Sequence, residues 1–391
     1  MLMLSSSSTP ASWFPNLRKL TWHADGTHIF APFSRMALVP SMLVLHLEIS
    51  SASDSTFLSV LSSLGTLCPY LQNVTMRIRH QSDDLKLLHQ ISPFIAWPIS
   101  QLRYLHTLSI WDVGSEITEH VMKLQAMRSL SLDLKSSSAW DENPRFQFPG
   151  FDGLKWFSLS TQTIEHASNV FSSLEVLKSK QVKVDVMSQI HASTVISKFL
   201  AILKERYGHD KLEYFSLSME YSRDIRIESG AFTPLYAFPN LTHLLIEGTG
   251  NISMSDKALC RLARARPKLQ TLKIGSCVIF DSTIRVPTFH GLISLLWSCP
   301  ALTLLALVID TTKSDGIDLK CPGGGRCNKR LKFFSLGNSR IKHPVDAALI
   351  ISGLSPYLKR VDLACWEKPP MNTTAQRKLD MGAMGDSQYD A

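Results

Sequence analysis

A nine-residue segment with a fixed placement of proline and leucine recurs along this chain. It first occurs as FPNLRKLTW at residues 14–22 and returns as CPYLQNVTM (68–76), FPNLTHLLI (238–246), RPKLQTLKI (266–274) and CPALTLLAL (299–307). Each copy follows the pattern Pro-x-Leu-x-x-Leu-x-Leu with apolar substitutions. Because proline cannot continue a helix and biases its predecessor toward extended backbone, the pattern predicts a helix-to-strand corner at each copy.

Looser copies, several without the proline, bring the number of segments to thirteen. Their anchor residues are Leu17, Met42, Leu71, Leu105, Met127, Leu154, Leu174, Leu212, Leu241, Leu269, Leu302, Leu331 and Leu358. The mean spacing of about 28 residues lies within the range of leucine-rich repeats. A repeat that extends along the chain favours one solenoid over the two or three domains that 391 residues would allow, because each unit buries its apolar face against its neighbours.

The expected fold class is therefore α/β, a leucine-rich-repeat solenoid of about thirteen irregular repeats with parallel concave strands and convex helices. The last two apolar residues of each copy are two positions apart, which is the period of a strand. Helical spacing predicts helices over 54–67, 83–95, 191–207, 255–265, 288–297 and 346–354. Longer connections are expected over 136–150, 181–190, 221–236 and 311–329. The solenoid is expected over residues 13–366, between a disordered N-terminus (1–12) and a disordered polar tail (367–391).

Composition and cysteine usage indicate a folded intracellular protein of the cytoplasm or nucleus. A hydrophobic content of 45% with 19% charged residues is ordinary for folded domains. The seven cysteines are odd in number and show no recurring pairing, which favours reduced thiols over a disulfide framework. The start of the sequence does not match a secretory signal, and no apolar run is long enough to span a membrane. The net charge of +8 favours a solvated basic surface over a nucleic-acid site.

Common catalytic signatures do not occur, so no catalysis, cofactor or metal is expected. The segment CPGGGRC at 321–327 could supply two thiolate ligands, but without a second Cys/His pair it favours a flexible loop. The segment RLARARPK at 261–268 places Leu259 and Leu262 inward and its arginines outward on a helix. It favours a solvated convex face, with a phosphate or RNA site as the alternative.

The side chains that alternate with the buried leucines are expected to face the concave surface and to bind a partner. The candidate residues are Arg77, Ser109, Trp111, Asp133, Ser158, Ser216, Glu247 and Lys273. The serines are consistent either with a polar surface for a partner or with the crowding of a parallel sheet. Trp111 would be an anchor for a partner if it is exposed, and the alternative is that a neighbouring loop covers it.

The FPNLRKLTW start, the Cys-Pro-x-Leu corners and the irregular spacing resemble the leucine-rich region of fungal F-box proteins, over about residues 14–365. The resemblance implies a target-binding subunit of a cullin–RING ubiquitin ligase, in which an F-box binds a Skp-type adaptor and the repeats bind the target. The Leu-Pro-x-Glu signature of an F-box does not occur in this sequence. Terminal repeats normally carry a polar cap, whereas apolar residues such as Phe14, Leu17 and Trp22 occur near the start. We therefore expect a truncated or degenerate member that binds the adaptor only if an F-box is missing from this sequence.

The predicted function is protein–protein recognition, with an unidentified protein target and no membrane association. The sequence leaves two alternatives open. One is a leucine-rich scaffold unrelated to ubiquitin. The other is a weak nucleic-acid or phosphoinositide binder that uses Arg261, Arg264 and Arg266.

Overall fold

The structure is a computed structural model that describes residues 14–24, 36–49, 61–78, 94–111, 115–134, 148, 150–151, 153–188, 193–207, 211–220, 226–248, 251–275 and 284–362. Within these residues, thirteen short strands form one parallel sheet and follow one another in chain order. They are β1 (Lys19–Ala24), β2 (Val44–Ile49), β3 (Asn73–Ile78), β4 (Thr107–Trp111), β5 (Ser129–Leu134), β6 (Trp156–Thr161), β7 (Gln181–Val186), β8 (Tyr214–Met219), β10 (His243–Glu247), β12 (Thr271–Ile274), β13 (Leu304–Leu307), β14 (Phe333–Ser335) and β15 (Arg360–Asp362). A separate parallel pair joins β9 (Arg226–Glu228) to β11 (Asn251–Ser253). This α/β arrangement is compatible with a solenoid.

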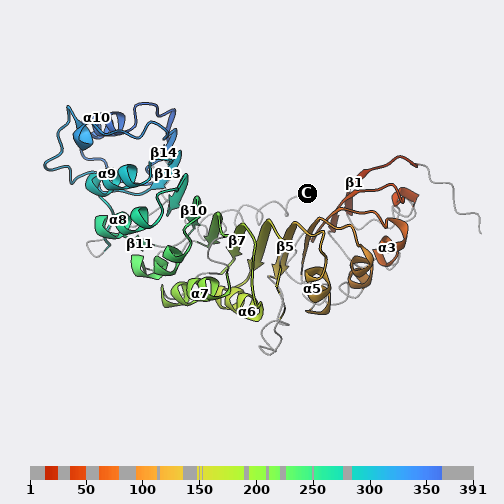
Figure 1. Ribbon diagram of the computed structural model, residues 1–391. Helices are drawn as coiled ribbons and strands as arrows, with labels where there is room; N and C mark the ends of the chain where they lie inside the picture. The colour runs from red at the N-terminus through yellow and green to blue at the C-terminus, as the bar shows by residue number, and fades with distance from the viewer. Residues whose placement is uncertain are drawn as a thin grey trace, which may run out of the picture. The chain divides into compact units, whose positions relative to one another are not determined.

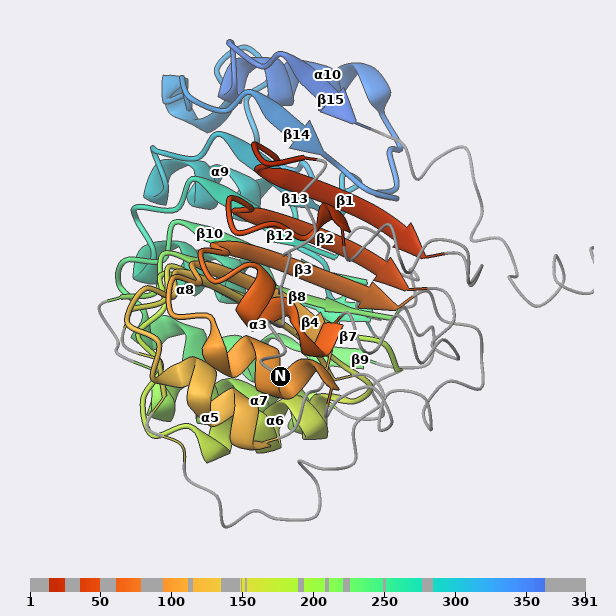
Figure 2. The same cartoon turned by 90° about the vertical axis from the view of Figure 1, so that its right-hand side faces the viewer.

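Helices occupy many of the connections between the strands. They are α3 (Leu64–Leu67), α5 (Ser115–Met122), α6 (Ile164–Ser173), α7 (Ser193–Arg206), α8 (Asp256–Ala265), α9 (Phe289–Ser298) and α10 (Pro344–Leu354), with 3-10 helices η2 (Ser229–Ala237) and η3 (Pro322–Gly325). The chain divides into two compact units. The first ends at Ile225 and also includes Gly230–Leu245, and the second consists of Arg226–Ser229 and the residues from Ile246 onward. Within the first unit, α6 and α7 lie on one side of the strands (Figure 1), and β1, β2 and β3 run side by side in the same direction (Figure 2).

The strands bury alternate side chains, as the period of a strand requires. In β5 and β7 every second residue is buried, and the residues between are half-buried. In the first unit, Phe171 of α6 contacts Phe157 of β6 and Phe199 of α7, with ring centroids 5.8 and 5.4 Å apart and both pairs nearly edge-to-face. All three rings are buried. Aromatic packing therefore attaches α6 to β6 and joins α7 to α6.

Twelve of the thirteen predicted anchors precede a strand in the described residues, and in each case the strand begins two residues after the anchor. The exception is Leu174, which makes an isolated bridge with Phe148 and lies in no strand. The strand of that region is instead β7, so the prediction of a connection over 181–190 is wrong at residues 181–186. The segment QVKVDV alternates apolar and polar residues with a period of two, which is itself a strand signal that the leucine pattern does not capture.

Four predicted helices agree with the structure within two residues at each end: α7, α8, α9 and α10. The structure adds α5 and α6, which the sequence patterns did not single out. Residues 54–60 and 83–93 of two other predicted helices lie outside the described residues, and so do the predicted terminal segments 1–12 and 367–391.

Two of the cysteines that precede a corner proline are buried thiols. Burial raises the pKa of Cys68 and of Cys299 to about 12, so both remain protonated at neutral pH. The Cys299 thiol donates to the carbonyl oxygens of Ala263 (3.6 Å) and Arg266 (3.3 Å) at the end of α8. This thiol therefore links the corner after α9 to the end of α8, and its role is structural.

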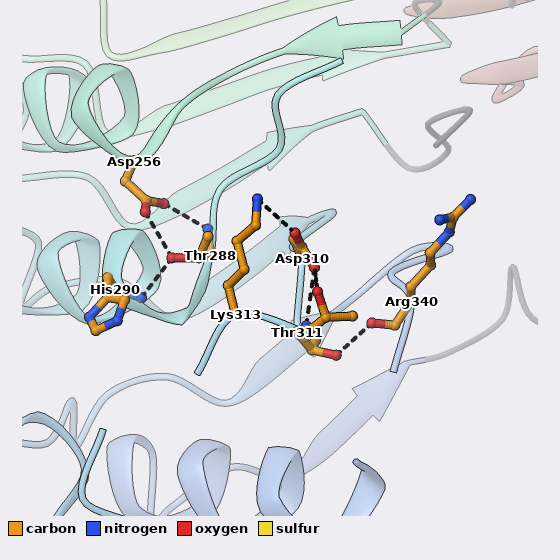
Figure 3. A network of polar contacts seen from close by, with 8 residues as sticks. Asp256, Thr288, His290, Asp310, Thr311, Lys313 and Arg340 are labelled. Carbon is orange, nitrogen blue, oxygen red and sulfur yellow. Dashed lines mark hydrogen bonds and ion pairs between the residues drawn. The ribbon is translucent and has the colours of Figure 1, made fainter. Parts of the chain in front are cut away.

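A carboxylate joins the first turns of α8 and α9 in the second unit (Figure 3). Asp256 accepts hydrogen bonds from the backbone N–H (2.6 Å) and the hydroxyl (2.8 Å) of Thr288. The Thr288 oxygen in turn accepts from the N–H of His290 and caps α9. Gly291 makes this approach possible, because a Cβ atom at that position would lie 2.3 Å from Asp256 Oδ1.

A second polar cluster lies in the same unit, also shown in Figure 3. Asp310 accepts from the hydroxyl (2.6 Å) and the N–H (3.1 Å) of Thr312, and it pairs with Lys313 at 3.3 Å. Burial acts to raise the pKa of Asp310, but the Thr312 hydrogen bonds and Lys313 outweigh it and lower the pKa below the usual value. The Thr311 hydroxyl donates to the carbonyl oxygen of Arg340 at 2.5 Å. The Asp310 contacts are therefore local, and the Thr311 hydrogen bond joins two loops 29 residues apart in the sequence.

We predict that Asp256→Ala lowers the free energy of unfolding by about 2–3 kcal/mol, because two hydrogen bonds to a charged acceptor are lost. Gly291→Ala should also destabilise, although alanine is favoured over glycine in most helices, because its Cβ displaces the carboxylate. The two changes should be non-additive by at least about 1 kcal/mol in a double-mutant cycle measured by urea unfolding. Asp315→Ala, which removes an exposed carboxylate of the same unit, is the control. Strict additivity of the two changes would contradict this account.

We predict that Gly150→Ala destabilises the first unit by at least about 2 kcal/mol, because φ is positive there and left-handed backbone costs other residues about 1–2 kcal/mol. At Gly150 φ is 84°, and a Cβ would also lie 1.9 Å from the carbonyl oxygen of Val176. Gly153→Ala is the matched control, because its Cβ meets nothing closer than 3.5 Å. Equal unfolding midpoints for the two variants, measured by tryptophan fluorescence in urea, would refute the prediction.

Candidate functional site

The second unit carries a groove on the exposed face of β12–β15, with a volume of about 440 Å³. Strand register places Thr271, Leu304, Phe333 and Arg360 in one row across the four strands. The next exposed row consists of Lys273, Ala306, Ser335 and Asp362. Between these rows, Leu272, Leu305 and Phe334 are buried in the core, whereas Val361 on the last strand is exposed. We call this surface the strand-face groove.

The centre of the strand-face groove is apolar and accessible. Leu304 and Ala306 are half-buried, and the ring of Phe333 on the neighbouring strand is 44% exposed. Three apolar side chains from adjacent strands therefore form a continuous patch that solvent reaches. A cluster of this kind can receive an apolar side chain from another molecule.

Ion pairs flank the apolar centre of the strand-face groove. On one side Lys273 Nζ lies 3.2 Å from Glu247 Oε1, and on the other Arg360 lies 3.6 Å from Asp362. All four side chains are at least one-third exposed, so each pair contributes little to folding stability. Their charged groups form the rim of the groove.

The exposed strand face of the first unit has a different character. Trp156 and Tyr214 lie in one row on either side of Gln181, with ring centroids 5.5 Å apart. Tyr214 also contacts the ring of His243, at 5.8 Å, and the His243 Nδ1 lies 2.8 Å from the Thr242 hydroxyl. Burial lowers the pKa of His243, and the nearby Glu213 carboxylate opposes this effect without cancelling it.

The predicted partner-binding residues divide into accessible and buried groups. Arg77 is exposed, and Ser109, Asp133, Glu247 and Lys273 are half-buried. Glu247 and Lys273 meet as an ion pair in the strand-face groove, whereas the first three lie in the first unit. The remaining three are buried, with exposed fractions of 4% for Trp111, 8% for Ser158 and 3% for Ser216.

Trp111 is therefore not an exposed anchor. Its burial supports the alternative, that its side chain is covered. Its indole N–H has no hydrogen-bond partner among the described residues. Ser158 and Ser216 align with Lys183 between them, and Lys183 pairs with Asp185 at 2.7 Å. The long lysine and its carboxylate belong to β7, the strand that the leucine pattern missed.

The apolar centre of the strand-face groove was not predicted as a site. Leu304 and Ala306 lie within the recurring segment CPALTLLAL, and Phe333 lies within RLKFFSL (330–336), the copy whose anchor is Leu331. All three face away from the core. An apolar residue at a position that is polar in most other copies is the sequence signal that could have identified them.

The basic segment at 261–268 differs from its prediction. Leu259 and Leu262 are buried as expected, and Arg261 and Arg264 are exposed. Arg266, expected to point outward, is 2% exposed, because it occupies the C-cap of α8 and donates to the carbonyl oxygen of Ala265. The continuous basic face of three arginines is therefore not formed.

The CPGGGRC segment forms a turn that packs against α9 and α10. Gly323 has a positive φ of 65°, and a Cβ there would lie 2.9 Å from a methyl carbon of Leu354. The Arg326 guanidinium lies over the ring of Trp297 at 5.2 Å. Among the described residues, no group of three His, Cys, Asp or Glu side chains could hold a metal ion.

Comparisons with known proteins do not assign this chain to a family. No family model matches the chain, and a search of curated proteins finds no match. In the described part of the chain, no helix combines the length and apolar character needed to cross a membrane.

We predict that His243 makes the first unit less stable in acid. The pKa of His243 is lowered in the folded chain, whereas an unfolded histidine has a pKa of about 6.5. As the pH falls, the unfolded chain therefore takes up a proton at a higher pH than the folded chain does. Stability is therefore complete above about pH 6.5 and declines as the pH falls toward the folded-state value. His243→Gln should reduce the slope of unfolding midpoint against pH over this window. His106→Gln, at an exposed site of the same unit, is the control, and an equal change in slope for both would contradict the prediction.

Proposed function

We propose that this protein is a leucine-rich-repeat solenoid that recognises another protein through the exposed faces of its strands. The observation that carries the proposal is the strand-face groove, in which Leu304, Ala306 and Phe333 lie between two exposed ion pairs. Interface centres are depleted of charged residues, enriched in aromatic residues and surrounded by polar rims. The strand-face groove has this arrangement of an apolar centre and a charged rim.

The more specific proposal is a target-binding part of an F-box-like subunit of a cullin–RING ubiquitin ligase. Its support is the resemblance of the recurring Pro-x-Leu segments to the leucine-rich region of fungal F-box proteins. A purified Skp-type adaptor that binds this chain, or a version of it extended upstream, would support the ligase role. A chain that binds its target but no adaptor in either form would instead be a recognition scaffold unrelated to ubiquitin.

Nucleic-acid or phosphoinositide binding through α8 is the weaker candidate. That proposal needs Arg261, Arg264 and Arg266 on one accessible face, and Arg266 is buried. Two exposed arginines on one helix are an ordinary solvated surface.

We predict that selection from a library of random displayed peptides yields ligands whose binding depends on Phe333. Phe333→Asp should weaken these ligands at least about 30-fold, because truncating a central apolar anchor costs about 2 kcal/mol or more. Val345→Asp is the matched control, since Val345 is 71% exposed on α10 outside the strand-face groove. Circular dichroism should show that both variants fold. Failure to select any peptide, or selected peptides indifferent to Phe333→Asp, would refute recognition through the groove.

A further inference from the structure

We propose that the strand-face groove binds an extended acidic peptide segment that inserts one apolar side chain between β13 and β14. This inference rests on the proposed function and adds to it the chemistry of the partner. It is carried by the placement of basic residues beside the groove and by the distribution of charge along the chain.

A lysine immediately precedes each of β14 and β15, two of the four strands that form the groove. Lys332 directly precedes Phe333, and Lys359 directly precedes Arg360. Their backbones are connected, because the Lys359 N–H donates to the Lys332 carbonyl at 2.8 Å, and the Lys332 N–H donates to Thr303 at 2.9 Å. Both side chains are exposed. The two ammonium groups therefore extend from neighbouring strand starts, one residue before the groove-lining residues of β14 and β15.

These lysines are not neutralised within the described part of the chain. No carboxylate there forms an ion pair with Lys332 or Lys359, whereas the groove carboxylates Glu247 and Asp362 already pair with Lys273 and Arg360. The charges inside the groove balance in two ion pairs, so the two lysines give its edge a net positive charge. A partner with carboxylates beside its apolar residue would supply the missing counter-charges.

The charge of the whole chain is concentrated in the sequence that forms this unit. Residues 246–362 contain 17 lysines and arginines against 8 aspartates and glutamates, which gives +9. Residues 1–245 contain 21 of each kind, which gives zero, and the net charge of the chain is +8. An excess on this scale raises the association rate of an acidic partner and makes that rate sensitive to salt.

The size and lining of the groove indicate the form of the partner. A volume of about 440 Å³ is at the lower end of the range of about 300–1,000 Å³ typical of ligand pockets. It suits a few residues of an extended chain better than the surface of a folded domain. The centre holds a single aromatic ring, Phe333, beside the aliphatic Leu304 and Ala306, whereas sites for single-stranded nucleic acid stack successive bases on several aromatic rings. The lining therefore favours an apolar side chain over a base.

The test compares three synthetic peptides that differ only in charge or in the central residue. The first has one leucine flanked by aspartates and glutamates, the second replaces the acids with lysines, and the third replaces the leucine with serine. Fluorescence anisotropy with the full chain should show binding of the first peptide alone. Doubling the salt concentration should weaken it severalfold, because exposed charges are screened.

Variants of the protein test whether Lys332 and Lys359 at the groove edge attract the acidic peptide. Lys332→Glu with Lys359→Glu should weaken the acidic peptide about tenfold or more and reduce the salt dependence. Arg261→Glu with Arg264→Glu is the matched control, because it makes the same charge change on exposed residues of α8 in the same unit. The control should change affinity less than about threefold. Equal losses for the two double variants would mean general attraction to the unit and would overturn the proposal.

Failure of this inference is distinguishable from failure of the proposed function. If library-selected peptides depend on Phe333 but carry no excess of acidic residues, the groove binds peptides as proposed, but its partner is not acidic. If a single-stranded oligouridylate displaces the acidic peptide and loses affinity in the Lys332→Glu, Lys359→Glu variant, the groove edge binds nucleic acid and the inference is wrong. Binding of the lysine-containing peptide as tightly as the acidic one would overturn it equally.

Discussion

The structure depends on the burial of one face of strands that are individually too short to be stable. β14 and β15 have three residues each, and their backbone hydrogen bonds contribute little net stability unless the side chains beneath them are removed from water. Within the second unit, Leu272, Leu305 and Phe334 form the buried row that provides this. The same alternation leaves the other face of each strand free to vary. In the proposed function, stability and partner recognition would therefore depend on opposite faces of the same strands.

Polar groups at the corners must be satisfied for this arrangement to form. Asn328, which is buried, donates from its amide to the Cys299 carbonyl at 3.2 Å and accepts from the N–H groups of Arg330 and Leu331. Its backbone N–H donates to Leu354 at the end of α10. One side chain therefore satisfies three backbone groups, two just before β14 and one at the corner after α9, where an unpaired buried group would be costly. This corner determines where Phe333 emerges on the exposed face.

In the strand-face groove, an apolar centre on strands that are packed against the core lies beside exposed positive charges. Its apolar centre lies on strands whose inner faces are fully used by the core, so that substitutions on the outer face can serve binding without disturbing the fold. The exposed lysines at the strand starts lie outside the sheet, where their solvation is retained. Recognition in this unit would then divide between a small apolar contact, which confers affinity, and long-range attraction, which favours acidic partners. The first unit, with its serines and its Trp156–Tyr214 row, offers a face of different chemistry.

The sequence by itself determined the α/β class and the start of most strands, because Pro-x-Leu corners and the leucine period act locally on the backbone. It also placed α8 and α9, where Ser255 and Thr288 supply local caps. It did not identify β7, since no leucine pattern marks QVKVDV. It left open whether Trp111 is covered, and it placed Arg266 on the exposed face although this residue is buried. Only the tertiary structure decided these points and the location of the groove. The exposure of a side chain depends on which residues from other segments cover it, and the alignment of Leu304 with Phe333 depends on strand register, neither of which is a property of a local sequence pattern.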